Sequence, residues 1–328
     1  MEHRRVGHGE PGCRRLRVPV SRFASIAAIG VIGVVGAISA TAASTAGANA
    51  RGYEGYAGAA GDANVQAYEG RPDAAGGASV QGYEGHAYAS VQSYEGYAYA
   101  AGDDKLLYRE SHWLYTAEGV GQQLIVYRCA NGEPFARKRV NTGSGAATPD
   151  FEMLDARSGY REGSRTRVGH REVFVQVDAR APERRASVSL RDNTVIDAGI
   201  DAFVSTHWNS LSETGISPLP FLVPSQLGYV DFSARKLREE RMEEHDVRWF
   251  RFSLASWYAF AAPHLEFGYD VRTHELREYL GPSNIHGDGN RSLSVRIEFP
   301  PGERRTDLSM ADVERAAAAP LTGRCMFP

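Results

Sequence analysis

Few residues in this chain have the types and spacing that enzyme chemistry requires. Ser233 and Lys236 match a Ser-x-x-Lys acyl-transfer pattern, but no Ser-Asp-Asn or Lys-Thr-Gly segment follows them. Ser144 lies in a loop of Gly, Ala and Thr, and this loop is not a Gly-x-Ser-x-Gly nucleophile elbow. The sequence therefore predicts no catalytic residue, which favours a protein that is not an enzyme over one that is.

Metal-binding patterns are weak in the same way. The chain has no His-Glu-x-x-His segment, and Glu243-Glu244-His245 is typical of a solvated charged surface. His286 and Asp288 share a glycine-rich loop that indicates a β-turn, since calcium would require more carboxylates. We expect no metal and no cofactor. One alternative stays open, an envelope hydrolase with a nonstandard site around His207, His286 and Asp288.

Aromatic residues are the remaining unusual feature. They are dense in the segments that read as strands, and a sheet with aromatics on its concave face can hold an acyl chain or a peptide. An ordinary hydrophobic core is the competing interpretation. The candidate ligand-binding residues are Trp113, Phe203, His207, Trp208, Phe221 and Trp249.

The elements that must position these residues are mostly strands. Residues 106–117 and 123–129 indicate a hairpin, and residues 293–299 alternate between apolar and polar side chains. Residues 197–211 carry apolar side chains at helical spacing, and Ser309 with Asp312 indicates a capped helix over 309–319. The predicted fold class is α+β: a curved antiparallel half-barrel sheet packed on one main helix.

Three cysteines bear on the compartment. Cys13 lies in the N-terminal segment, which leaves Cys129 and Cys325 as an even pair. In an oxidising compartment we expect these two to form a disulfide that ties the C-terminal tail to an early strand. Two separate buried thiols are the alternative.

The 328 residues, with a net charge of −3, divide into three unequal parts. Residues 1–50 carry six Arg, an apolar run over 23–38 and two Ala-x-Ala sites, which predicts a signal peptide. An uncleaved signal anchor is the alternative, and it would be the only contact with a membrane. Both place the rest of the chain in the periplasm or outside the cell.

Residues 51–104 repeat a Tyr-Glu-Gly motif, with tyrosines at 53, 68, 83 and 94. Their Gly- and Ala-rich composition offers too little apolar surface to offset backbone ordering, so we expect a disordered linker. Residues 105–328 remain as a single domain. Its 29 basic and 30 acidic residues leave a charge of −1, which gives no electrostatic argument for nucleic acid.

Five segments carry a resemblance to a known family. Residues 127–138, 159–163, 197–204, 221–225 and 279–285 together are similar to an uncharacterised family of exported proteobacterial proteins, a domain of unknown function. The overall plan also resembles lipoprotein carriers, in which a half-barrel sheet wraps round a helix. The family resemblance implies no catalytic residue.

The function we expect is non-enzymatic binding of an apolar or amphipathic ligand or partner, such as a lipid, a lipoprotein or another envelope component. Besides the hydrolase, one further alternative is a structural or interaction protein that acts through its repeats.

Overall fold

The computed structural model describes residues 91–255, 264–287 and 291–327. The predicted signal segment, the first three Tyr-Glu-Gly repeats and Asp288 lie outside these residues. No helix in the described part is long and apolar enough to cross a membrane.

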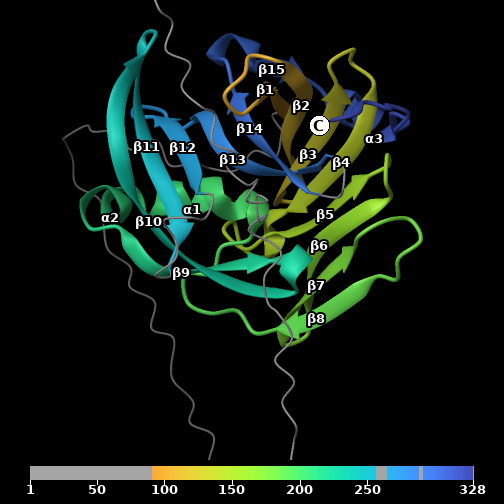
Figure 1. Cartoon of the computed structure of the whole chain (residues 1–328), viewed down its shortest axis with the longest axis horizontal. Helices are drawn as coiled ribbons and strands as arrows, with labels where there is room; N and C mark the ends of the chain where they lie inside the picture. Colours follow the sequence, from red (N-terminus) through yellow and green to blue (C-terminus); the bar gives the residue numbers. More distant parts are fainter. Residues whose placement is uncertain (1–90, 256–263, 288–290, 328) are drawn as a thin grey trace, which may run out of the picture.

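Fifteen strands build one antiparallel sheet (Figure 1). The first eight are β1 (Val91–Ala100), β2 (Leu106–Ala117), β3 (Val120–Cys129), β4 (Pro134–Asn141), β5 (Asp150–Asp155), β6 (Tyr160–Arg167), β7 (His170–Gln176) and β8 (Arg184–Val188). The others are β9 (Ile216–Val223), β10 (Gly228–Met242), β11 (His245–Leu254), β12 (Leu265–Asp270), β13 (Leu276–His286), β14 (Ser292–Glu298) and β15 (Arg305–Leu308).

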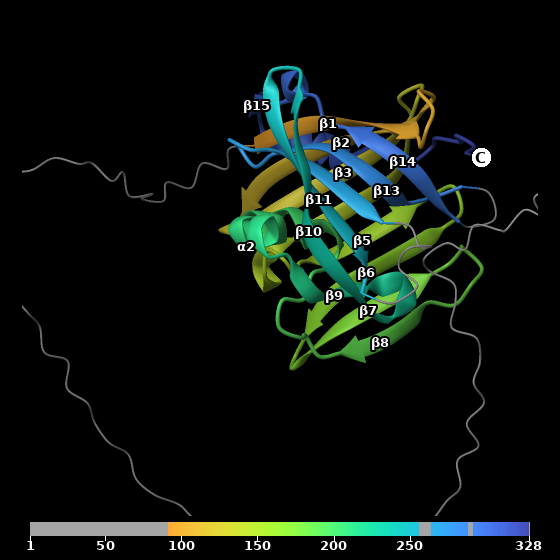
Figure 2. The same cartoon turned by 60° about the vertical axis from the view of Figure 1, so that its left-hand side comes forward.

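The sheet is curled and unclosed. Its order is β8-β7-β6-β5-β4-β3-β2-β1-β14-β13-β12-β11-β10-β9, and β15 pairs with β1. Consecutive strands therefore pair in two long meanders that β1 joins to β14. Figure 2 shows the two meanders facing each other across the curl, and the short 3-10 turn η3 (Pro224–Gln226) reaches from β9 to contact β6 and β7.

β1 corrects the predicted boundary of the linker at residue 104. The last Tyr-Glu-Gly repeat is a strand in the interior of the sheet, paired along its length with β2 and over Tyr97–Ala100 with β14. Val91 and Ala98 are fully buried there. Composition alone indicated disorder, but neighbouring strands supply the apolar contacts that the repeat itself lacks.

The main predicted helix is broken into shorter pieces and strands dominate the chain, so the fold is predominantly β, and the α+β class with one main helix is wrong. Residues 197–211 divide into η2 (Asp197–Gly199), α1 (Ile200–Thr206) and α2 (Trp208–Glu213), with non-helical backbone at His207. The Thr206 hydroxyl donates to the Ala202 carbonyl, a side-chain bond of the kind that competes with helix geometry. The curved antiparallel sheet itself is confirmed.

The second predicted helix is present as α3 (Met310–Ala318). Ser309 and Asp312 form the predicted capping box. The helix packs Val313 and Ala316 on the outer face of the sheet, against Leu124 and Val126. It leaves the concave face to the segment that contains α1 and α2.

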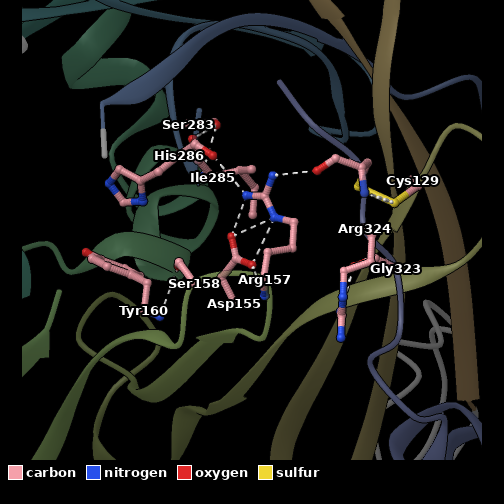
Figure 3. A network of polar contacts seen from close by, with 11 residues as sticks. Cys129, Asp155, Arg157, Ser158, Tyr160, Ser283, Ile285, His286, Gly323 and Arg324 are labelled. Carbon is pink, nitrogen blue, oxygen red and sulfur yellow. Dashed lines mark hydrogen bonds and ion pairs between the residues drawn. A yellow bond between two sulfur atoms is a disulfide. The ribbon is translucent and has the colours of Figure 1, made fainter. Parts of the chain in front are cut away.

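The C-terminal tail is fastened at one point of the sheet (Figure 3). Cys129 and Cys325 form the predicted disulfide. Beside it, Arg157 makes a bidentate ion pair with buried Asp155 and donates to the carbonyls of Cys325, at 3.3 Å, and His286, at 2.9 Å. The tail, the β5–β6 turn and the end of β13 therefore share one guanidinium group.

Candidate functional site

A cavity of about 590 Å³ lies inside the curl. Ligand sites typically occupy about 300–1,000 Å³, so the volume suits a small molecule. Its apolar wall comes from both meanders and from α1. That wall includes Leu107, Ile125, Phe151, Ile200, Phe221, Val230, Phe232, Leu265, Phe267, Leu276, Leu293, Ile297 and Phe299.

Strand register explains how polar side chains reach this apolar interior. Residues that face each other in antiparallel strands project from the same side of the sheet. One such row runs across six strands: Tyr94, His112, Ile125, Lys138, Met153 and Glu162. Tyr94, His112, Lys138 and Glu162 all line the cavity.

Lys138 lies at the centre of a buried charged cluster. Its Nζ is 2.7 Å from Asp197 Oδ2, and the residue is only 4% exposed. Asn284 Nδ2 donates to Glu162 Oε1 at 2.9 Å and to Asp197 Oδ1 at 3.3 Å. One lysine and one amide therefore hold two carboxylates together.

Protonation in this cluster follows from burial. Loss of solvation raises the pKa of Glu162, and the nearby Asp197 carboxylate raises it further, while Lys138 and Asn284 act in the opposite direction. Burial also raises the pKa of Tyr160, beside Glu162. Burial therefore favours the protonated form of Glu162 relative to a solvated glutamate.

A second group of polar side chains, on β2 and β3, also lines the cavity. His112 Nε2 lies 2.9 Å from Glu110 Oε2, and its Nδ1 lies 3.1 Å from the Gln123 amide. The ring of Tyr94 stacks on His112 at a centroid distance of 4.4 Å. On the opposite side, Asp201 accepts a 2.7 Å hydrogen bond from Tyr269, and loss of solvation raises its pKa.

The charges on the cavity wall do not balance. Glu110, Glu162, Asp197 and Asp201 provide four carboxyl groups, against the two cations Lys138 and Arg291. The interior is therefore acidic when these groups are ionised. Among the described residues, no cluster of three or more His, Cys, Asp or Glu side chains could hold a metal ion.

The predicted ligand-binding residues are only partly brought together. Phe221 lines the cavity, whereas Phe203 and Trp208 lie in the neighbouring core cluster. Trp113 packs on the outer face, in the α3 cluster, and is not a cavity residue. Trp249 is also placed away from the cavity, because it alternates with the inward-facing Phe250 on β11 and has the Arg238 guanidinium over its ring.

The residues of the hydrolase alternative are not assembled in the described structure. His286 lines the cavity, and burial lowers its pKa. His207 does not line it; its ring stacks on Phe203, and its Nδ1 lies 3.0 Å from the Phe203 carbonyl oxygen. Asp288 lies outside the described residues.

Sequence reasoning missed the polar residues of the site. The available signal was alternation: Lys138 shares a strand face with Ala136 and Val140, and Glu162 shares one with Tyr160 and Ser164. A charged residue in register with buried neighbours indicates a buried charge. Their partner Asp197 comes from a distant segment, and no pattern in the sequence pairs it with them.

Comparisons with known proteins show only remote likenesses. No family model and no curated protein matches the chain. Similar solved structures include a DUF1329 family protein from Desulfovibrio piger, with 12% identity, 70% of this chain and 92% of that chain covered, and a TM-score of 0.26. Another is a domain named for outer membrane lipoprotein sorting from Vibrio parahaemolyticus, with 11% identity, 70% and 91% covered, and a TM-score of 0.21.

Proposed function

We propose that this protein binds one amphipathic molecule, with its apolar chain along the aromatic and aliphatic wall and a cationic headgroup at the carboxylates. The observation that carries the proposal is a cavity of about 590 Å³ that combines this wall with four carboxyl groups and two cations. Binding and not catalysis is the function that these groups support best.

The apolar wall supports a chain-like ligand. Burying one methylene group stabilises a complex by about 0.8 kcal/mol, which corresponds to roughly fourfold in affinity. Phe151, Phe221 and Phe267 offer rigid surface for such contacts. Affinity should therefore rise by about fourfold with each added methylene until the chain fills the cavity.

The acidic cluster supports a positively charged headgroup. Lys138 is already paired with Asp197, so it is not free to receive an anion. Glu162 and Asp201 both have raised pKa values, and a bound cation would favour their ionised forms. Binding of a cation should therefore strengthen as pH rises through these pKa values.

The cellular setting follows from other features of the chain. A disulfide is typical of an oxidising compartment, and the basic, apolar and small-residue pattern of residues 1–50 is that of an export signal. We therefore propose that the domain works in the periplasm or outside the cell, where an envelope lipid or lipoprotein is the natural source of an amphipathic ligand.

The headgroup is tested with two probes that share one chain. Dodecylamine and dodecanoate are titrated by calorimetry at pH 7.5, below their micelle concentrations. The amine should bind one per chain and at least about tenfold more tightly than the acid, a difference of about 1.4 kcal/mol. Equal affinities, or tighter binding of dodecanoate, would contradict the proposed headgroup.

A matched pair of variants localises the effect. Glu162→Gln removes a carboxylate inside the cavity and should narrow the preference for the amine severalfold. Glu152→Gln removes one from the neighbouring strand β5, where the side chain pairs with Arg161 and does not line the cavity. The second variant should behave as the wild type.

A further inference from the structure

The sequence of β1 occurs a second time, immediately before β1. Residues 80–89 read VQGYEGHAYA, and residues 91–100 read VQSYEGYAYA. The two segments differ only where Gly82 corresponds to Ser93 and His86 corresponds to Tyr97. The chain therefore carries two nearly identical candidates for one strand of its sheet.

The place that β1 occupies, which we call the β1 slot, has β2 on one side and β14 with β15 on the other. The slot is selective. Val91 and Ala98 are fully buried in it, and a Cβ atom on Gly96 would lie 2.6 Å from Phe299 Cε1. A strand that fills the slot must therefore supply valine, glycine and alanine at these three positions.

Residues 80–89 meet this requirement. In the sequence alignment of the two segments, Val80, Gly85 and Ala87 correspond to Val91, Gly96 and Ala98. The contacts of Tyr94 and Glu95 are also available to the copy: Tyr94 stacks on His112, and Glu95 accepts a 2.8 Å hydrogen bond from Ser111. Tyr83 and Glu84 occupy the equivalent positions.

The preceding repeat does not meet the requirement, which shows that the match is not a property of every Tyr-Glu-Gly segment. Residues 65–74 place Pro72 where β1 has Ala98. A proline cannot donate a backbone hydrogen bond and is excluded from the interior of a sheet.

We propose that the β1 slot is a strand-binding site with two ligands in the same chain, residues 91–100 and residues 80–89, which compete for it. Residues 91–100 are the occupant in the structure. They have a shorter connection to β2, through residues 101–105, and the Tyr97 hydroxyl donates to Glu303 at 3.2 Å. This inference does not depend on the proposed ligand.

The chain entropy lost when residues 80–89 replace residues 91–100 in the β1 slot is small. With residues 80–89 in the slot, the connection to β2 grows from five residues to sixteen. Closure entropy rises only with the logarithm of loop length, so the longer loop disfavours the exchanged state by about sixfold. The exchanged register draws eleven more residues of the N-terminal segment toward the domain, up to about 36 Å of extended chain.

Two glycine substitutions test the competition in the full chain. Gly96→Val should exclude residues 91–100 from the slot, and the chain should remain folded because residues 80–89 replace them. Gly85→Val alone should change nothing. The double variant should lose the cooperative unfolding transition, because neither segment then fits.

Hydrogen exchange with mass spectrometry identifies the occupant. In Gly96→Val, amide protection should move from residues 91–100 to residues 80–89 while the protein remains a monomer. The proposal is overturned if Gly96→Val is as unfolded as the double variant, or if the double variant is as stable as the wild type. A dimer in Gly96→Val would also overturn it, since a second copy would then supply the strand.

A deletion gives an independent test. Removing residues 90–100 joins Ala89 to Ala101, so residues 80–89 stand directly before the β1–β2 turn. This variant should fold with nearly wild-type stability. The same deletion with Ala87→Pro, which copies the proline of the preceding repeat, should not fold, and equal behaviour of the two deletions would contradict the proposal.

Discussion

Lys138 Nζ lies 2.7 Å from Asp197 Oδ2, although the two residues are 59 positions apart and both face the inside of the curl. The contact joins β4 of the first meander to the segment that begins α1. Because it is buried, each charge depends on the other for compensation. The ion pair therefore contributes both to the stability of the fold and to the charge of the cavity wall.

Removing the lysine should be costly. Lys138→Met leaves Asp197 and Glu162 without their cation, and breaking a buried pair in this way costs about 3–5 kcal/mol of unfolding free energy. The additional change Asp197→Asn should restore part of the loss. Urea denaturation measures both variants.

Lys236→Met is the matched control for this prediction. Lys236 pairs with Glu239 at 2.8 Å on the surface, and pairs of that kind are worth at most about 1 kcal/mol. A Lys138→Met protein as stable as Lys236→Met would show that the buried pair does not stabilise the fold.

The raised pKa of Glu162 should appear in the pH dependence of the unfolding free energy. Burial, followed by repulsion from Asp197, raises its pKa in the folded state, so the folded protein binds this proton more tightly than the unfolded chain. The associated stability is present below the ordinary glutamate pKa and is lost as pH rises through the raised value. Glu162→Gln should therefore gain stability relative to the wild type between pH 4 and pH 8.

The stability of Glu152→Gln relative to the wild type should change with pH in the opposite direction to that of Glu162→Gln. Partial burial acts to raise the pKa of Glu152, but hydrogen bonds and charges from Arg161 and Arg165 outweigh this and lower it. Its contribution is therefore present above the ordinary pKa and is lost as pH falls. Denaturation midpoints across this pH range compare the two variants, and parallel curves would be inconsistent with the assigned shifts.

The attachment of the C-terminal tail by Arg157 should depend on the planar shape of the guanidinium group. Arg157 holds Asp155 by two nitrogens and reaches two carbonyls, and lysine cannot reproduce this fork. Arg157→Lys should lose about 2–3 kcal/mol of unfolding free energy and make the tail more sensitive to proteolysis. Arg324→Lys, whose contacts are with carbonyls of adjacent tail residues, should stay within about 0.5 kcal/mol of the wild type.

The disulfide should add to this anchor. It joins residues that are 196 positions apart, and the loss of a native disulfide typically costs about 2–5 kcal/mol. Cys129→Ser with Cys325→Ser should destabilise the protein by this amount, as should reduction of the wild type. Unchanged thermal unfolding after confirmed reduction would contradict the prediction.

The features that sequence patterns predicted correctly are those that nearby residues determine, or that follow from a count of cysteines. The hairpin of β2 and β3, the α3 capping box and the cysteine pair follow from alternation, from short-range spacing and from counting. Composition does not predict the strand at 91–100, because a Gly- and Ala-rich strand is stabilised by its neighbours and not by its own composition. The predicted length of the helix over 197–211 is too great, because the spacing of apolar residues does not indicate the break at His207.

The candidate site was predicted less well than the fold. Among the predicted ligand-binding aromatics Phe221 lines the cavity, whereas Trp113 and Trp249 do not, because aromatic density does not tell which face of the sheet a side chain occupies. Shifting a strand by one residue reverses its faces, and register depends on partners that are remote in sequence. The cluster of Lys138 and Asp197 depends on the same long-range pairing.

A cavity-filling variant tests whether the ligand binds inside the curl. Val230 lines the cavity, whereas the next residue on β10, Asp231, is exposed and projects to the opposite side of the sheet. Native mass spectrometry with dodecylamine should detect one bound amine per chain in the wild type and in Asp231→Trp, and none in Val230→Trp. A folded Val230→Trp protein that binds the amine as the wild type does would contradict binding inside the curl.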